Sequence, residues 1–309
     1  LALKLDPEAR INDRFGTVNL MIGADPVDLA TARTETYAHP GALPEVTPGR
    51  LEDDLRRRDF TINSMAVPID AEAELIDPFG GIADLRSGVL RVLHADSFTD
   101  DPTRAFRAAR YAARFGFDLE PGTAELMLGV NPATVSRERI ENELRLISLE
   151  ETALDGMRLV GRWGLIELDE SRLRLASDAL GLVEDGPWKD EAPRGALILE
   201  AVFGDSSRWS RLIESPDGVW EAYQRARGQT ALTLILARAA GARWLDQWQG
   251  EWRWVELEIT GADLLAAGVP EGPRIGDGLD AALRAKLEGD TTGADSEMNI
   301  ALEAAGMAK

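Results

Sequence analysis

The segment that begins at Asp100 carries the most chemically specific pattern in the sequence. In Asp100-Asp101-Pro102-Thr103-Arg104 two carboxylates precede a proline, and that order favours the first turn of a helix. Further arginines follow at spacings of three or four residues, namely Arg107, Arg110 and Arg114. This spacing predicts that the guanidinium groups share one face of a helix.

A carboxylate and a guanidinium one helical turn apart can read a nucleotide base. Cytosine and adenine both present an amino donor beside a ring-nitrogen acceptor, so Asp101 could accept from the amino group while Arg104 donates to the ring. Uracil and guanine would set a carbonyl against the carboxylate, at a cost of about 1–3 kcal/mol per unsatisfied group. Arg107 and Arg110 could then hold the triphosphate. The alternative is a salt-bridged surface helix in which Asp100 pairs with Arg104.

Two other segments carry carboxylates that could work beside this helix. In Arg56-Arg57-Arg58-Asp59, Asp59 could accept from a ribose 2′-hydroxyl, and Arg58 could pair with a phosphate. Taken alone, such a run is more often a solvated basic turn. Asp28 lies in a predicted strand and could point into a cleft, although a lone aspartate near a strand end is usually a turn residue.

The elements that would position these residues change character along the chain. Thr17–Ile22 and Val27–Arg33 have the composition of strands, and a short helix is expected from Asp53 or Asp54 to Asn63. After Asp77 the hydrophobic period moves toward 3.6 residues. Helices are predicted over Asp101–Phe115, Thr123–Leu128, Arg137–Leu149, Thr152–Trp163 and Leu279–Leu287. The segment Gly289–Lys309 is expected to be loose. We therefore predict an α+β fold with a small sheet-bearing head followed by helices.

Composition excludes several classes of protein. The chain has 309 residues, no cysteine and a net charge of −20, so a disulfide framework and a thiolate metal site are excluded. No apolar run reaches the length of a membrane span, so a cytoplasmic protein without membrane contact is expected. The negative charge argues against a nucleic-acid partner. However, every basic residue from Arg50 to Arg145 except His94 is arginine, so an RNA surface would be a local arginine patch.

Taken together, these segments resemble the class II tRNA nucleotidyltransferase (CCA-adding enzyme) and bacterial poly(A) polymerase family. The resemblance is strong from residue 11 to about residue 150. It is carried in order by Phe15-Gly16-Thr17, Asp28–Glu35, Asp54–Ala66, Asp77–Gly81, Asp100–Arg107 and Arg139–Leu144. A second resemblance, in Gly261–Leu264 and Gly272–Gly276, is to the tail of the same family.

The resemblance implies an architecture and an activity. The architecture is a partial polymerase-β-like nucleotidyltransferase head at 1–77, a base-recognising helical neck at 78–150, a helical body at 151–250 and an RNA-binding tail at 251–309. The activity is template-independent addition of C and A to the 3′ end of tRNA from CTP and ATP, with Mg²⁺. The implied catalytic residue is Asp28, and the implied nucleotide-binding residues are Arg58, Asp59, Asp101, Arg104, Arg107 and Arg110.

The sequence departs from the family pattern in two places. The family's Gly-Gly…Arg-Asp loop and its Asp-x-Asp metal pair would precede Leu1, so the chain is expected to be N-terminally truncated, without metal ligands and inactive as it stands. Asp100 occupies a position where the family carries glutamate, which leaves the switch from CTP to ATP open. Addition of CC only or of A only, poly(A) polymerase activity, and non-catalytic binding of RNA or nucleotide therefore stay as alternatives, and the oligomeric state is undetermined.

Overall fold

The computed structural model describes residues 4, 6–12, 16–69 and 74–307, so Phe15 of the motif Phe15-Gly16-Thr17 lies outside the described residues. The chain divides into two compact units, Leu1–Leu168 and Asp169–Lys309. The boundary falls between the helices α8 (Ala153–Arg162) and α9 (Glu170–Asp185). The nucleotide-reading segments proposed from the sequence all belong to the first unit.

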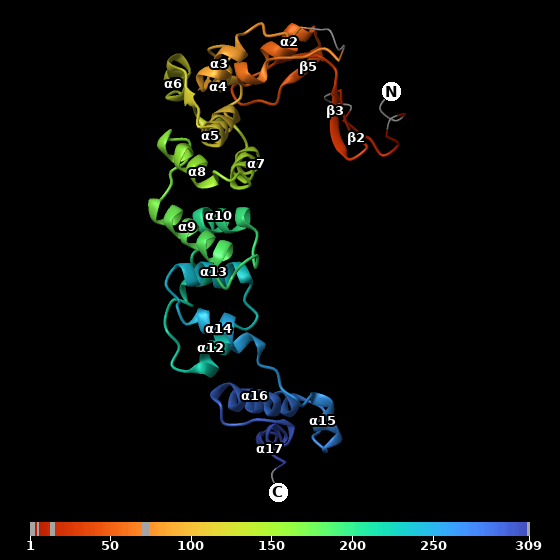
Figure 1. Cartoon of the computed structure of the whole chain (residues 1–309), viewed down its shortest axis with the longest axis vertical. Coiled ribbons are helices and arrows are strands. Elements are labelled where there is room, and N and C mark those ends of the chain that lie inside the picture. Colours follow the sequence, from red (N-terminus) through yellow and green to blue (C-terminus); the bar gives the residue numbers. More distant parts are fainter. Residues whose placement is uncertain (1–3, 5, 13–15, 70–73, 308–309) are drawn as a thin grey trace. The chain divides into compact units, whose positions relative to one another are not determined.

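The longer strands occupy the N-terminal part of the first unit, coloured red to orange in Figure 1. β1 (Arg10–Asn12), β2 (Thr17–Ile22) and β3 (Asp25–Ala30) form an antiparallel sheet in that order, and β4 (Arg33–Thr36) pairs antiparallel with β5 (Glu45–Pro48). The prediction of β2 is confirmed. The second predicted strand, Val27–Arg33, is divided between β3 and β4.

Helices follow the strands in the first unit, which confirms the predicted α+β fold. They are α2 (Leu51–Arg56), α3 (Gly81–Ser87), α4 (Ser97–Asp100), α5 (Thr103–Phe115), α6 (Pro121–Met127), α7 (Arg137–Ser148) and α8, with the 3-10 turns η1 (Thr61–Asn63) and η2 (Pro132–Thr134). A short parallel pair, β6 (Val89–Leu90) with β7 (Asp118–Leu119), lies among them.

Asp101 and Gly116 define the two ends of α5. The Asp101 carboxylate accepts hydrogen bonds from the main-chain N–H of Thr103 at 3.0 Å and from its hydroxyl at 2.6 Å. An aspartate before a helix commonly satisfies free donors in this way. Gly116 ends the helix with φ 67°, a left-handed conformation that glycine adopts without Cβ strain. The helix therefore begins at Thr103 rather than at the predicted Asp101.

Small side chains allow α5 to pack closely against α7 and α8. Ala105, Ala108 and Ala109 are fully buried. Where α8 meets α7, a Cβ atom added to Gly156 would lie 2.8 Å from Cγ2 of Ile147, so the two helices approach too closely for a larger residue. This packing fixes the directions in which the arginines of α5 point.

The second unit is helical throughout its described residues. Its elements are α9, α10 (Arg194–Phe203), α11 (Ser207–Ser210), α12 (Val219–Ala226), α13 (Ala231–Ala239), α14 (Leu245–Gly250), η3 (Trp252–Trp254), α15 (Gly261–Ala266), α16 (Pro273–Glu288) and α17 (Ala294–Ala304). Leu264, Val269 and Ala282 belong to a separate small core at the C-terminal end.

The expectation that Gly289–Lys309 is loose is wrong, because residues of this segment form α17 and pack against α16. The buried positions of α17 and its end are largely alanines, such as Ala301 and Ala305. Alanine favours helix strongly but contributes little hydrophobic signal to a periodicity, so the pattern was weak. The helix before it also begins earlier than predicted, at Pro273 rather than Leu279.

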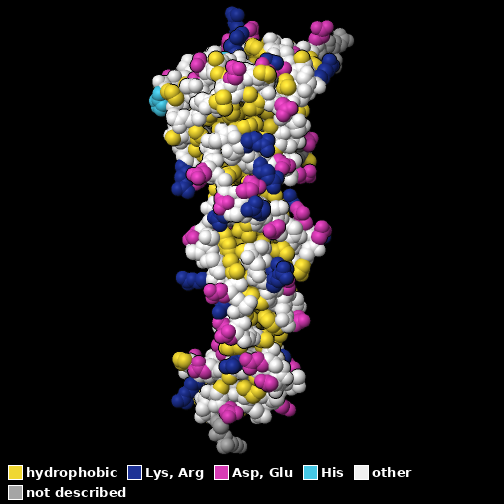
Figure 2. All heavy atoms as spheres, turned by 90° about the vertical axis from the view of Figure 1, so that its left-hand side faces the viewer, with side chains coloured by type: hydrophobic (Ala, Val, Ile, Leu, Met, Phe, Trp, Pro, Cys, Tyr) yellow, Lys and Arg dark blue, Asp and Glu magenta, His cyan; other side chains and the backbone are white. Residues whose placement is uncertain are grey.

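The surface is mixed in charge. On the face shown in Figure 2, acidic and basic side chains are interspersed in both units, without a continuous basic surface. This mixture on one face is consistent with a chain whose net charge is −20. Among the described residues, no helix combines the length and the apolar character that crossing a membrane requires.

Candidate functional site

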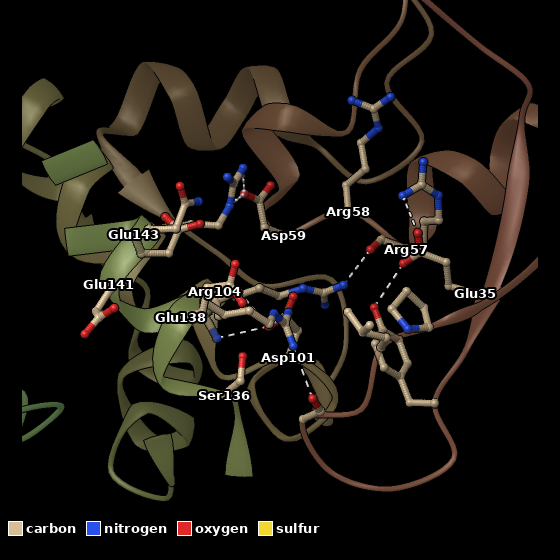
Figure 3. Close-up of a pocket in the computed structure, with 18 of the residues that line it drawn as sticks. Glu35, Arg57, Arg58, Asp59, Asp101, Arg104, Ser136, Glu138, Glu141 and Glu143 are labelled. Atoms are coloured by element: carbon tan, nitrogen blue, oxygen red, sulfur yellow. Dashed lines mark hydrogen bonds and ion pairs between the residues drawn. The ribbon is translucent and has the colours of Figure 1, made fainter. Parts of the chain in front are cut away.

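A cleft of about 1320 Å³ in the first unit gathers most of the residues singled out from the sequence. Its walls come from β4 and the loop that follows it, the segment after α2, the beginning of α5, and α7. The predicted residues that line it are Arg58, Asp59, Asp101, Arg104 and Arg107. Figure 3 shows Asp59 together with Asp101 and Arg104 in the close-up of this cleft.

One oxygen of Asp101 is fully engaged and the other is not. Oδ1 accepts the two hydrogen bonds from Thr103 and a third from Nη2 of Arg139 at 2.8 Å. Oδ2 takes part in none of these bonds, and it belongs to a side chain that lines the cleft. The carboxylate is therefore held rigidly through one oxygen while the second can accept a hydrogen bond from a ligand.

Arg104 is buried, with 5% of its surface exposed, and is held by hydrogen bonds at both ends of its guanidinium. Nη1 donates to the hydroxyl of Ser97 at 2.7 Å, and Nη2 donates to the main-chain oxygen of Arg57 at 2.7 Å. The expected alternative of an exposed helix with an Asp100–Arg104 pair does not describe this side chain. Asp100 instead lies 4.0 Å from His94, and burial raises the pKa of the Asp100 carboxyl.

Asp59 and Arg107 form a tight ion pair across the cleft wall. Nε and Nη2 of Arg107 lie 2.8 and 2.6 Å from Oδ2 of Asp59. The other oxygen, Oδ1, accepts from the main-chain N–H of Phe60 and from Nδ2 of Asn63. Arg107 Nη2 also donates to the hydroxyl of Tyr111 at 3.0 Å. The carboxylate expected to read a ribose is thus already bound on both oxygens.

A second charged network supports the segment that carries Arg58. Arg57 donates to Glu35 at 2.8 Å and to Asp54 at 2.8 Å, and Arg58 lies 3.2 Å from Asp54. Burial would raise the pKa of Asp54, but the hydrogen bonds from the arginines outweigh it and hold that pKa below its usual range. The Arg58 side chain remains 44% exposed. A part-exposed guanidinium at the rim can reach an anionic ligand.

Two predicted site residues do not line the cleft. Arg110 lies 3.5 Å from Glu150, and its Nε is buried without a hydrogen-bond partner among the described residues. Asp28 is exposed on β3, where its carboxylate accepts from Nδ2 of Asn19 at 2.6 Å. Three-residue steps fall about 60° short of a full helical turn, so the arginine row drifts away from the cleft along α5.

Several cleft residues were not predicted as site residues from the sequence. Glu35 belongs to β4 and Tyr37 follows that strand, and Arg139 and Glu143 belong to α7. The Tyr37 hydroxyl donates to Glu35 at 2.9 Å, and burial raises the pKa of this phenol. Glu35, Arg139 and Glu143 fall inside the segments that carry the family resemblance, but a residue type alone gives no signal of which distant segment it will meet.

The described residues contain no preformed cluster of metal ligands. Among them, no group of three or more histidine, cysteine, aspartate or glutamate side chains is arranged to hold a metal ion. Mg²⁺ prefers oxygen ligands in a near-octahedral arrangement. The carboxylate of Asp28, the implied catalytic residue, accepts a hydrogen bond from the amide of Asn19 on the neighbouring strand.

Comparison with known proteins finds similar sequences among tRNA nucleotidyltransferases. Residues 4–91 match the family described as the poly A polymerase head domain. An A-adding tRNA nucleotidyltransferase of Aquifex aeolicus is 44% identical over 159 residues, which are 50% of this chain and 19% of that protein. A CC-adding tRNA nucleotidyltransferase of Deinococcus radiodurans is 33% identical over 282 residues, which are 87% of this chain and 71% of that protein.

Solved structures extend the similarity to the second unit. The apo form II of a CCA-adding enzyme superposes with a TM-score of 0.79 at 26% identity, covering 98% of this chain and 83% of the other. A CCA-adding enzyme in complex with ATP gives a TM-score of 0.76 at 26% identity, covering 98% and 82%. The chain nevertheless spans only 19% and 40% of the lengths of the A-adding proteins of Aquifex aeolicus and Geobacter sulfurreducens.

Proposed function

The chain belongs to the class II tRNA nucleotidyltransferase family, and on that premise we propose that it takes part in the template-independent addition of nucleotides to the 3′ end of tRNA. The premise rests on the relative of which the chain covers 71% at 33% identity. The proposed substrates are CTP and ATP, and the proposed partner is the 3′ end of tRNA. The complexes of similar proteins with CTP, ATP and tRNA support these choices.

One observation carries the proposal for the nucleotide, which is that Asp101 and Arg104 line the same cleft as Asp59. Oδ2 of Asp101 would accept the amino group shared by cytosine and adenine. The Arg104 guanidinium has N–H groups beyond those bound to Ser97 and Arg57, and one of these would donate to the ring nitrogen. Uracil or guanine would leave buried groups unpaired, at a cost of about 1–3 kcal/mol each.

The remaining cleft residues would hold the sugar and the phosphates. Asp59 is proposed to accept a ribose hydroxyl with Arg107 beside the sugar, and Arg58 is proposed to meet the negative charge of the nucleotide. Arg110 is proposed only as a weaker contact of the nucleotide, because it lies outside the cleft and beside Glu150. Asp28 keeps its proposed catalytic role only if a ligand or another part of the protein reaches β3.

The reaction as a whole is proposed to use Mg²⁺, as the family resemblance implies. The chemistry that Mg²⁺ would supply when bound is neutralisation of negative charge and a lower pKa for the attacking hydroxyl. The described residues of the cleft are assigned to nucleotide selection. The residues at 251–309 are proposed to bind RNA.

Specialised addition is the second candidate. The curated relatives include both A-adding and CC-adding enzymes. The CC part and the A part of the CCA sequence are thus each added by a protein similar to this chain. Asp101 and Arg104 would accept both bases and therefore do not distinguish full addition from either half. Poly(A) polymerase activity is the further alternative, supported by the match to the head domain of that name.

The test is a single-nucleotide assay with the chain, Mg²⁺ and tRNA transcripts that end before C, before the second C and before A. The proposal expects incorporation of C or A on the matching transcript, and none of U or G. Incorporation on only one class of transcript would assign the specialised activity. Selective binding of CTP and ATP without incorporation would assign a non-catalytic binding protein, and equal use of all four nucleotides would refute base reading.

A further inference from the structure

Arg107 occupies one carboxylate oxygen of Asp59, so that a ligand has no free place on that oxygen. Oδ2 of Asp59 already has Nε and Nη2 of Arg107 within 2.8 Å. Oδ1 is bound by the Phe60 N–H and by Asn63 Nδ2, both of which belong to the same tight turn. A carboxylate oxygen offers two lone pairs. A ribose hydroxyl can therefore bind Asp59 fully only if Arg107 gives up its place on Oδ2.

Glu143 is a buried carboxylate in the wall of the same cleft, and one of its oxygens has no hydrogen-bond partner within the described part of the chain. The residue is 7% exposed, and its Oε2 is buried without a hydrogen-bond partner among the described residues. Native proteins pair nearly all buried polar atoms, so an orphan acceptor calls for an explanation. Because Oε2 is inaccessible to solvent, a ligand in the cleft cannot satisfy it directly. A neighbouring side chain that exchanges its present partner for Oε2 can satisfy it.

Arg107 is the side chain in a position to do so. Burial lowers the pKa of Arg107, but the carboxylates of Asp59 and Glu143 outweigh it, and the pKa stands above its usual value. Arg107 thus lies in the fields of two carboxylates while hydrogen-bonding only one of them. Figure 3 shows Glu143 and Asp59 on the same side of the cleft, with Glu143 projecting from α7.

We propose that Glu143 is a positioning residue that receives the Arg107 guanidinium when a sugar hydroxyl of the incoming nucleotide takes Oδ2 of Asp59. The inference rests on the proposed function, because the ligand is a ribonucleoside triphosphate. In the exchange, Oδ2 loses N–H donors and gains an O–H donor, while Oε2 of Glu143 gains the N–H donor that it lacks. Arg107 keeps a carboxylate partner in Glu143, while Asp59 exchanges its ion pair for hydrogen bonds from the sugar hydroxyl, the Phe60 N–H and Asn63.

The exchange predicts a role in choosing the sugar. A ribonucleotide drives Arg107 toward Glu143, whereas a nucleotide without a 2′-hydroxyl cannot displace it. Removing the charge of Glu143 should therefore weaken binding of CTP more than binding of 2′-deoxy-CTP. A hydrogen bond between charged groups is worth about 1.5–3 kcal/mol, so CTP affinity should fall by at least about tenfold.

The test compares the dissociation constants of CTP and 2′-deoxy-CTP for the unaltered chain and for Glu143→Gln. The exposed Glu125 of α6 supplies the control variant Glu125→Gln. We expect the preference for CTP to shrink about tenfold in Glu143→Gln and to stay unchanged in Glu125→Gln. If Glu143→Gln weakened the binding of CTP and of 2′-deoxy-CTP equally, Glu143 would have only a structural role and the inference would be overturned. Failure of the unaltered chain to bind any nucleotide would instead overturn the proposed function.

A second measurement needs no variant and so remains valid if Glu143→Gln does not fold. Burial raises the pKa of Glu143 against the opposing charges of Arg107 and Arg110 on α5, while Asp101 and Asp59 reinforce the rise. Arrival of the Arg107 guanidinium would lower that pKa again. Above the ordinary glutamate value of about 4.3, CTP should then release more protons than 2′-deoxy-CTP.

The proton release is measured by titration calorimetry in two buffers of different ionisation enthalpy. Protonation of the triphosphate contributes equally for both nucleotides, so their difference isolates the effect of the 2′-hydroxyl. A larger release with CTP supports the exchange. Identical release with the two nucleotides would show that Glu143 does not change its partner, and the inference would be wrong.

Discussion

Asp101 divides its two oxygens between structure and recognition. Oδ1 binds the first turn of α5 and the guanidinium of Arg139, and that guanidinium also donates to the main-chain oxygen of Gly41 at 3.1 Å. The direction of Oδ2 therefore depends on two helices and a loop at once. A selecting group must be held this firmly, because a carboxylate free to rotate could turn away from an unfavourable carbonyl.

A prediction at this scale concerns Asp101→Asn. The amide keeps the size and an oxygen for the helix start, but it can turn an NH₂ donor toward the base. That donor suits the carbonyl of uracil, so the preference for CTP over UTP should fall by about 1–3 kcal/mol, or roughly 5- to 150-fold. Competition binding of the two nucleotides measures it.

The neighbouring Asp100→Asn provides the matched control for this substitution. Asp100 lies beside His94 and does not line the cleft, so its amide should leave the CTP preference unchanged. If Asp101→Asn and Asp100→Asn behave alike, the base is read by another group.

At the scale of elements, α5 shows what a local pattern can predict and where it stops. Pro102 and the alanines predicted the helix well, because helix capping and close packing depend on residues that are neighbours in the sequence. The shared arginine face was predicted only in part. Arg104 and Arg107 line the cleft, whereas Arg110 and Arg114 both lie 3.5 Å from Glu150. The alanine face packs against α7 and α8, and this fixes which arginines can turn inward.

The contribution of α7 to the cleft could not be predicted from the sequence. Arg139 reaches Gly41 across 98 positions of the chain, and nothing in either local pattern specifies that meeting. Gly41 itself has φ 72°, and a Cβ there would lie 2.3 Å from the main-chain oxygen of Thr134. Such close approaches depend on how the elements pack, which periodicity does not encode.

A prediction at the element scale concerns Glu297, the fully buried carboxylate of α17. It accepts hydrogen bonds from Lys286 Nζ of α16 and from the main-chain N–H of Glu258, both at 2.7 Å. Glu297→Gln keeps the shape but removes the charge from these bonds. We expect the free energy of unfolding of the second unit to fall by about 1.5–3 kcal/mol at neutral pH in denaturant titrations.

The same substitution has a defined pH dependence. Burial would raise the pKa of Glu297, but the bonds from Lys286 and the main chain outweigh it and hold the pKa below its usual range. A carboxyl whose pKa is lower in the folded state stabilises the fold at pH values above its unfolded pKa of about 4.3. This stabilisation is lost as the pH falls through the folded pKa. The difference between Glu297→Gln and the unaltered chain should therefore vanish in acid.

The exposed Asp295 on the same helix is the control for Glu297. Asp295→Asn should change stability by no more than about 0.5 kcal/mol. A stability difference for Glu297→Gln that is constant with pH would contradict the assignment of its effect to charge.

At the scale of the whole molecule, the compact units differ from the segments suggested by the family resemblance. Residues 78–150 and residues 1–77 both belong to the first unit, and the cleft is built from both. The bond from Arg104 to the main-chain oxygen of Arg57 joins them directly. The sequence predicted the order of strands and helices correctly, but bonds between segments decide where a chain divides.

This division predicts separable binding activities. A fragment of Leu1–Leu168 contains every residue that lines the cleft, so it should bind CTP and ATP with dissociation constants within about threefold of those of the whole chain. Its affinity for tRNA should fall, because the proposed RNA-binding residues 251–309 are missing. Equilibrium binding of labelled nucleotide and labelled tRNA measures both. Full tRNA affinity in the fragment would place the RNA surface in the first unit.

The most direct test of base reading is a crystal structure of the chain with CTP. We predict that the cytosine amino group lies about 3 Å from Oδ2 of Asp101 and that the ring nitrogen lies about 3 Å from a guanidinium nitrogen of Arg104. A cytosine bound in the cleft with its amino group facing any other residue, while Asp101 and Arg104 keep only their present partners, would contradict the account.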